Sequence, residues 1–285
     1  MWVFYAFCSA FFAGITAILA KCGIKKTDSS VATAIRTVIV LIFAWIMVFL
    51  VHSQTQITQI SSKTFCFLIL SGIATGASWL CYFKALQIGD LNKVIAIDKS
   101  SIVLTILLAF LLLGEPISLS KLCGMTAIGI GTYLMIEKKK STKLVRGTSW
   151  FFFAVLSAFF ASLTTILGKI GISDIESNLG TAIRTSVVLI LAWFVVFMSH
   201  KQHTIKEISK KELCFICFSG IATGASWLCY YKALQDGLAS VVTPIDKLSI
   251  LVTVTFSYFV FKERLTQKSW IGLMLIVAGT FTMII

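Results

Sequence analysis

The sequence predicts an all-α membrane protein with ten transmembrane helices in two inverted five-helix repeats. Two observations lead to this fold class. Hydrophobic residues make up 58% of the 285 residues and charged residues only 13%, whereas a soluble domain carries about 25% charged residues. The second half of the chain also repeats the first, at a constant offset of 148 residues. The apolar content excludes a disordered chain and argues strongly against a soluble enzyme.

Ten apolar segments account for most of the chain, since one membrane-spanning helix needs about 20 apolar residues. Residues 38–51, for example, are apolar on every face and lack the alternation of a barrel strand, so helices are predicted. No basic region precedes the first segment, which is therefore expected to be a retained helix rather than a cleaved signal peptide. The predicted spans are 2–22, 31–51, 64–86, 93–113, 119–137, 150–170, 179–199, 212–234, 239–261 and 267–285.

The duplication is close enough to define two copies. Residues 71–87 return as 219–235 with a single change, Phe83 to Tyr231. Each copy holds five spans, an odd number, so the second copy must cross the bilayer in the opposite sense to the first. Inverted repeats are a recurring architecture of secondary transporters and predict alternating access around a site near mid-bilayer. A duplicated scaffold without transport is the alternative.

The expected domain boundaries follow from the duplication. A first five-helix repeat is predicted over 1–137, a basic connector over 138–149 and a second five-helix repeat over 150–285. Lys and Arg of the loops gather on one side of the predicted membrane, and the connector lies on that side. The positive-inside rule then places the connector in the cytoplasm and both chain ends outside it.

A short motif with a glutamate ends the fourth span of each copy, Gly-Glu-Pro at 114–116 and Lys-Glu-Arg at 262–264. With ten spans in two inverted repeats, the whole chain resembles the EamA family of the drug/metabolite transporter superfamily. The resemblance implies a transporter, not an enzyme, for small metabolites such as amino acids, choline or other polar solutes. Small multidrug exporters of that superfamily use a carboxylate in the first helix, but spans 2–22 and 150–170 contain no Asp or Glu.

Charged residues within the spans are the main candidates for a functional site. A charge at the centre of a spanning helix costs about 2.5 to 3.5 kcal/mol, so those retained usually face a cavity. Arg36 and Arg184 are repeat mates inside their spans, and a guanidinium matches the planar geometry of a carboxylate or phosphate. Four further lysines lie near span ends, where snorkelling to the headgroups is expected: Lys21, Lys84, Lys169 and Lys232.

Two duplicated acid–base pairs, Asp98-Lys99 and Asp246-Lys247, open the fourth span of each copy. Adjacent helical residues point about 100° apart, so one member can face a cavity while the other meets a neighbouring helix. A structural cap or ion pair and a substrate or proton role both stay open. Pro244 in the second copy predicts a kink close to Asp246.

Small and aromatic residues share the third span of each copy. Glycines four apart, at 72 and 76 and again at 220 and 224, predict close helix packing. Most rings that follow are expected to anchor or pack the helix. Trp79 and Trp227 are the predicted cavity-lining pair.

The sequence thus predicts a secondary transporter that moves an anionic or zwitterionic solute, such as an amino acid or organic acid, across the plasma or inner membrane. The alternatives are a cation, quaternary-amine or choline-type transporter, and a non-transporting lipid-binding or scaffolding protein. Cysteine and histidine spacing matches no metal site and no catalytic motif is present, so no metal, cofactor or catalytic residue is predicted. The expected partners are a small-molecule substrate and the lipid bilayer, without nucleic acid. One chain holds both copies, so a monomer suffices and a dimer is left open.

Overall fold

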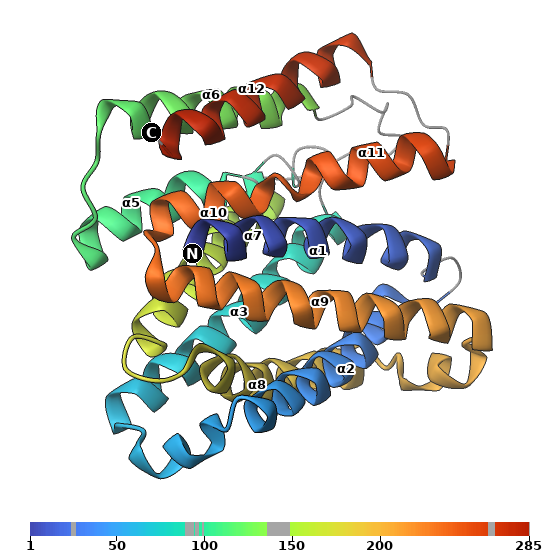
Figure 1. Cartoon of the computed structure of the whole chain (residues 1–285). Helices are drawn as coiled ribbons and strands as arrows, with labels where there is room; N and C mark the ends of the chain where they lie inside the picture. The colour runs from blue at the N-terminus through green and yellow to red at the C-terminus, as the bar shows by residue number, and fades with distance from the viewer. Residues whose placement is uncertain are drawn as a thin grey trace. The chain divides into compact units, whose positions relative to one another are not determined.

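The computed structural model describes residues 1–23, 27–88, 94, 97–98, 100–135, 149–261 and 266–284. Every regular element within these ranges is helical (Figure 1). Eight helices of the described chain are long and apolar enough to cross a membrane, and one shorter apolar helix accompanies them. The prediction of an all-α, multi-pass membrane protein is confirmed.

Each of the ten predicted spans contains a helix. The first copy supplies α1 (Trp2–Gly23), α2 (Ser29–Leu50), α3 (Ser62–Ile88), α5 (Ser101–Leu113) and α6 (Leu119–Met135). The second copy supplies α7 (Ser149–Gly171), α8 (Ser177–Met198), α9 (Lys210–Asp236), α10 (Ala239–Lys247), α11 (Ser249–Phe261) and α12 (Gln267–Ile284).

Two short 3₁₀-helices occupy segments for which the sequence predicted only loops. They are η1 (Ser53–Gln59) and η2 (Gln202–Glu207), which follow α2 and α8. Each is preceded by a histidine in the left-handed region, His52 with φ 55° and His200 with φ 52°. These histidines are repeat mates, so the same backbone turn redirects the chain in both copies.

Side-chain caps explain why α2 and α8 begin two residues before the predicted spans. The Asp28 carboxylate accepts a hydrogen bond from the Ser30 amide at 2.9 Å. The Glu176 carboxylate, its repeat mate, accepts from the amides of Asn178 at 2.8 Å and Leu179 at 3.2 Å. A cap of this kind satisfies amides that have no partner within the helix, so the helix extends to the capping residue.

The predicted span 239–261 is divided into α10 and α11, with Leu248 between them. Pro244 lies inside α10, as expected from a proline that interrupts a long apolar segment. The chain tightens at the division, where the Leu248 amide donates to the Ile245 carbonyl and the Leu251 amide to the Leu248 carbonyl. Asp246 therefore lies in the last turn of α10, next to an interruption of the helix.

Two compact units make up the structure, and each takes helices from both copies. Unit 1 comprises the described residues of Met1–Ile73, Leu167–Gly237 and Ile245–Lys262. Unit 2 comprises those of Ala74–Ile166, Leu238–Pro244 and Glu263–Ile285. The units therefore do not coincide with the predicted repeats 1–137 and 150–285, whose boundaries stay a prediction from the sequence. The connector 138–149 lies outside the described residues except for Ser149.

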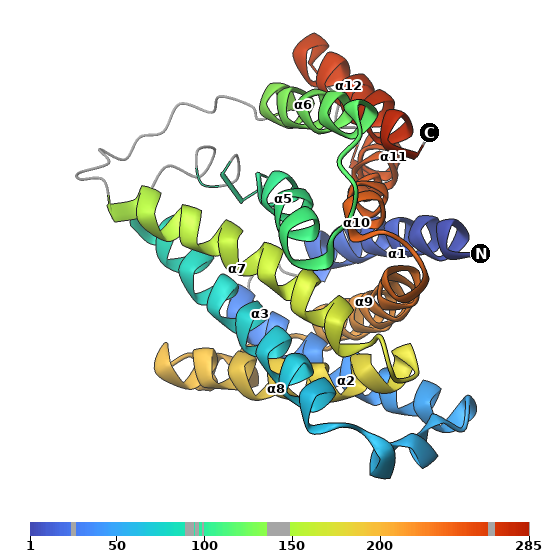
Figure 2. The ribbon, with the colours of Figure 1, turned by 90° about the vertical axis from the view of Figure 1, so that its left-hand side faces the viewer.

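In unit 1, α1 lies along α9 and runs in the opposite direction (Figures 1 and 2). Ser9 contacts Ser226, and Thr16, farther along α1, contacts the earlier Thr223. These are the first span of one copy and the third span of the other. Copies of the same orientation would place them parallel, so the antiparallel pair is the arrangement that inverted copies require.

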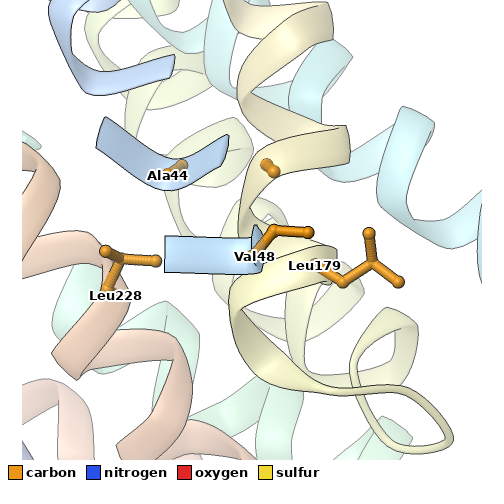
Figure 3. Packing of buried hydrophobic residues seen from close by; sticks show 5 residues of the cluster. Ala44, Val48, Leu179 and Leu228 are labelled. Carbon is orange, nitrogen blue, oxygen red and sulfur yellow. The ribbon is translucent and has the colours of Figure 1, made fainter. Parts of the chain in front are cut away.

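Close packing of α2, α8 and α9 forms the core of unit 1. Ala44 and Val48 of α2 meet Leu179 of α8 and Leu228 of α9 (Figure 3). The glycine pattern of α9 contributes directly, since a Cβ at Gly220 would lie 2.6 Å from the Cβ of Ile39. The prediction that these glycines serve helix packing is confirmed.

In unit 2, α6 and α12 lie side by side in both views and run antiparallel (Figures 1 and 2). Gly131 faces Gly272, and a Cβ at either one would lie 2.5 Å from the other's carbonyl oxygen. Gly124 faces Gly279 in the same way. Gly272 is the repeat mate of Gly124, and Gly279 is the repeat mate of Gly131. The two glycine contacts therefore join the copies, which the sequence did not predict.

Candidate functional site

The sequence-predicted site residues divide between the two units. Unit 1 contains Arg36 on α2, Arg184 on α8, Trp227 on α9, and Asp246 and Lys247 on α10. Unit 2 contains the half-buried Trp79 on α3 and Asp98. Lys99 lies outside the described residues.

Arg184 is enclosed by residues of unit 1. Its relative exposure is 2%, and its Nε donates a hydrogen bond to the Ser71 hydroxyl at 3.2 Å. The guanidinium carbon lies 5.2 Å from the centre of the Trp227 ring and 4.6 Å from the centre of the Tyr231 ring. The negative faces of aromatic rings stabilise a cation that has left water, so the two rings make burial of this charge tolerable.

Asp246 is held by a buried hydroxyl pair. The Ser9 hydroxyl donates to an Asp246 carboxylate oxygen at 2.6 Å and lies 3.3 Å from the Ser226 hydroxyl. Ser226 in turn donates to the Ser9 carbonyl at 3.1 Å. Among the residues described in unit 1, no Lys or Arg pairs with Asp246, so the ion-pair interpretation left open by the sequence is not seen.

The same cluster recurs in unit 2 with the repeat mates of these residues. The Ser157 hydroxyl donates to Asp98 at 3.4 Å, and Ser78 donates to the Ser157 carbonyl at 3.0 Å. The hydrogen bond to the carboxylate is longer here than in unit 1. Each Asp thus has a serine donor from the first span of the other copy, although the sequence analysis did not single out any of these serines.

One helix segment brings the unit 1 residues together. Ser226 and Trp227 are neighbours on α9, and Tyr231 follows one turn later. The Trp227 and Tyr231 rings face Arg184, whereas Ser226 is linked to Asp246 through the Ser9 hydroxyl of α1. Of the predicted residues, the structure therefore brings Arg184 directly against Trp227 and connects Asp246 to the neighbouring Ser226 through Ser9.

Arg36 and Lys247 are both partly buried. Within unit 1, no described residue accepts a hydrogen bond from either cation, forms an ion pair with it or places a ring over it. Arg36 lies roughly 10 Å along the helix axis from the start of α2, well inside the spanning segment. A partly buried cation without a partner in its own unit is the kind of group expected to meet a ligand.

Two of the four lysines near span ends, Lys169 and Lys232, have described contacts, and the side chain of Lys21 lies outside the described part of the structure. Lys232 forms an ion pair with Asp236 at 3.4 Å and a hydrogen bond with the Gln235 side chain at 3.2 Å. Lys169 donates to the Gly237 carbonyl. Lys84 is exposed. These contacts lie at helix ends, and the expected snorkelling to the headgroups stays a prediction.

A polar cavity of about 510 Å³ opens in unit 1 beside η1 and the loop between α7 and α8. It is lined by Gln56, Gln59, Ser173, Asp174, Ile175, Glu176 and Gln235. None of the predicted site residues lines it. Among the described residues, no group of three or more His, Cys, Asp or Glu side chains is arranged to hold a metal ion.

Several relatives of this chain are named as uncharacterized transporters. An uncharacterized transporter of Sinorhizobium sp. is 42% identical over 131 residues, which are 46% of this chain and 93% of that protein. That relative is therefore about as long as one copy. The uncharacterized transporter YxxF of Bacillus subtilis is 26% identical over 212 residues, 71% of this chain and 64% of that protein.

A solved crystal structure shares the fold across nearly the whole length. It has a TM-score of 0.76 at 12% identity and covers 99% of this chain and 96% of that chain. The family model described as the EamA-like transporter family matches residues 1–137 and 148–285, so both copies are covered. The resemblance inferred from the sequence is confirmed, and the chain belongs to the EamA-like transporter family.

Proposed function

We propose that this protein is a secondary transporter of a small anionic or zwitterionic solute, with amino acids and organic acids as the first candidates. It acts in the plasma or inner membrane by alternating access between the two faces. The observation that carries the proposal is the pair of partly buried cations in unit 1, Arg36 and Lys247, for which the described residues of that unit supply no partner. Removing an unpaired charge from water costs several kcal/mol, which binding of an anionic group offsets.

Asp246 favours a zwitterion over a simple anion. Its carboxylate is held by the neutral Ser9 hydroxyl and so keeps acceptor capacity for an ammonium group. Lys247 follows it directly on α10. An α-amino acid carries one group for a cation and one for a carboxylate, so amino acids rank ahead of dicarboxylates and phosphate esters.

Counterflow into liposomes tests the proposal. The purified full chain is reconstituted, preloaded with one unlabelled solute at a time, and offered the labelled form of glycine, glutamate, malate, glucose 6-phosphate or choline. We expect counterflow of an amino acid or organic acid that is lost in Arg36→Gln. Counterflow of choline alone, or no flux of any solute while the protein stays monodisperse, contradicts the proposal.

Export of an organic cation is the second candidate function, because the Asp246 carboxylate is linked through Ser9 to Ser226, the neighbour of the aromatic Trp227 on α9. The Trp227 and Tyr231 rings already lie beneath Arg184, however, and a cationic ligand would compete with that guanidinium. If the protein exports organic cations, efflux of tetraethylammonium should require Asp246 and should be unchanged in Arg36→Gln. The same liposomes therefore distinguish the two functions.

A further inference from the structure

We infer that the two duplicated arginines have divided their roles: Arg36 binds the anionic group of the solute, whereas Arg184 is a structural brace that Tyr231 locks inside unit 1. The inference rests on the proposed function, since it assigns the solute contact within the same site. The duplicated sequence alone would suggest the same role for both arginines, whereas the inference gives them different roles.

Tyr231 is the residue that distinguishes the second copy. It is the single change between residues 71–87 and 219–235, where the first copy has Phe83. The Tyr231 side chain is 2% exposed, its ring faces the Arg184 guanidinium at 4.6 Å, and its hydroxyl is hydrogen-bonded with Ser71. Ser71 also accepts a hydrogen bond from Arg184. The tyrosine thus encloses the guanidinium with its ring and joins the Ser71 contact with its hydroxyl.

A second difference between the copies accompanies the tyrosine. Gly168 of α7 stands where the first copy has Ala20. A Cβ at Gly168 would lie 2.7 Å from Cε1 of Tyr231, 3.2 Å from its hydroxyl and 3.1 Å from the Ser71 hydroxyl. A methyl group does not fit at that distance without displacing the ring. The glycine at 168 therefore makes room for the Tyr231 ring and hydroxyl, and the two differences between the copies fit together.

The first copy lacks both features that enclose Arg184, since Phe83 replaces Tyr231 and Ala20 replaces Gly168. A phenyl side chain at position 83 has no hydroxyl to offer a serine, and Ser219, the mate of Ser71, donates to the Thr16 carbonyl at 3.2 Å. No residue described in unit 1 pairs with Arg36. Toward the described residues of unit 1 its guanidinium thus keeps all five donors, which is the capacity needed for bidentate binding of a carboxylate.

The rate of modification by phenylglyoxal measures the difference in accessibility between the Arg36 and Arg184 guanidinium groups. The full chain in lipid nanodiscs is treated with the reagent, and modification of each arginine is followed by mass spectrometry, with Arg146 as the reagent control. We expect Arg184 to react about tenfold more slowly than Arg36, because its reaction requires the ring contacts to open. In Tyr231→Phe and in Gly168→Ala, Arg184 should react several-fold faster while the Arg36 rate stays the same. Equal rates in the wild type, or an Arg184 rate unaffected by both variants, would overturn the lock.

Protection by solute tests the binding half of the inference. The labelling is repeated with glycine, glutamate or malate at millimolar concentration. We expect at least one of them to slow modification of Arg36 several-fold and to leave the Arg184 rate unchanged. Protection of Arg184 alone, or protection of neither arginine by a solute that shows counterflow, overturns the assignment. If no solute shows counterflow, the proposed function fails while the labelling rates still decide whether Arg184 is locked.

Discussion

Asp28 illustrates how a single carboxylate is held at the loop before α2. It caps α2 through Ser30 and pairs with Lys201 at 3.1 Å. Burial raises the pKa of the Asp28 carboxyl, but the hydrogen bond and charge of Lys201 and the Ser30 amide lower it more, so the pKa lies below its ordinary value. The stabilisation is therefore complete above the unfolded pKa of about 3.9 and is lost as the pH falls through the folded value.

Replacing Lys201 should shift this acid sensitivity. In Lys201→Ala the pKa of Asp28 returns toward its ordinary value, so this carboxyl loses part of its stabilising effect at pH 7 and stability falls less between pH 7 and pH 3 than in the wild type. Because both side chains are partly exposed, the loss at pH 7 should stay below about 1 kcal/mol. Thermal unfolding between pH 3 and pH 7 measures both effects, with Lys206→Ala in the same loop as the control. Superimposable curves for the two variants would contradict this role of Lys201.

The Ser9 hydroxyl should contribute more to the free energy of unfolding than the hydroxyl of its repeat mate, Ser157. Ser9→Ala leaves the Asp246 carboxylate without its donor at 2.6 Å, and a loss of about 1 to 3 kcal/mol is expected. Ser157→Ala is the matched control, because the corresponding bond to Asp98 is longer at 3.4 Å. Denaturation in detergent compares the two. A loss for Ser157→Ala equal to or larger than that for Ser9→Ala would show that the carboxylate bond is not the stabilising contact.

Sequence alone predicts the site residues that carry charge. Arg36, Arg184 and Asp246 stand out because a charge in an apolar span is costly and needs a reason. Ser9 and Ser226 do not, since a serine in a helix can satisfy its hydroxyl on the preceding turn and costs little there. Tyr231 could have been recognised as a candidate from the sequence, because it is the single change between residues 71–87 and 219–235.

At the scale of elements, the start of α10 is held by Glu115, which follows α5, and by Lys121 of α6. Within unit 2, the Glu115 carboxylate accepts from the amides of Ala239 at 2.7 Å and Ser240 at 2.9 Å. Lys121 donates to the Ser240 hydroxyl at 2.9 Å and the Pro116 carbonyl at 2.8 Å. A nine-residue helix is too short to form alone. These contacts join segments far apart in the chain, so the sequence showed the Gly-Glu motif but not its role.

Neutralising Glu115 should loosen the start of α10. Glu115→Gln keeps the shape but loses the charge of the carboxylate that accepts from the amides of Ala239 and Ser240, at an expected loss of about 1.5 to 3 kcal/mol. Hydrogen exchange of residues 239–243 should speed up, whereas Glu207→Gln in the exposed η2 should leave it unchanged. Exchange at the wild-type rate in Glu115→Gln would show that this glutamate does not stabilise the start of α10.

At the scale of the whole molecule, each unit combines helices from both copies. The sequence predicts the copies and their inversion, because repetition and an odd number of spans are visible in a single chain. It does not predict which helices of the two copies pack together. Contacts such as Gly131 with Gly272 leave no local pattern that identifies the partner helix.

Packing of α6 on α12 can be tested with two glycines of α6. Gly131→Val places methyl groups against the Gly272 carbonyl and should destabilise the protein by about 1 to 3 kcal/mol. Gly129 has nothing within 4 Å of its added Cβ, so Gly129→Val should have little effect. The midpoints of thermal unfolding compare the variants. Equal midpoints would contradict the close approach of the two helices.

The most direct measurement is an electron cryomicroscopy structure of the full chain in a nanodisc with the solute that gives counterflow. The account predicts density for a carboxylate or other anionic group within hydrogen-bonding distance of the Arg36 guanidinium, with Arg184 still covered by Trp227 and Tyr231. An Arg36 side chain directed to the lipid headgroups, with the solute bound elsewhere or absent, would contradict it.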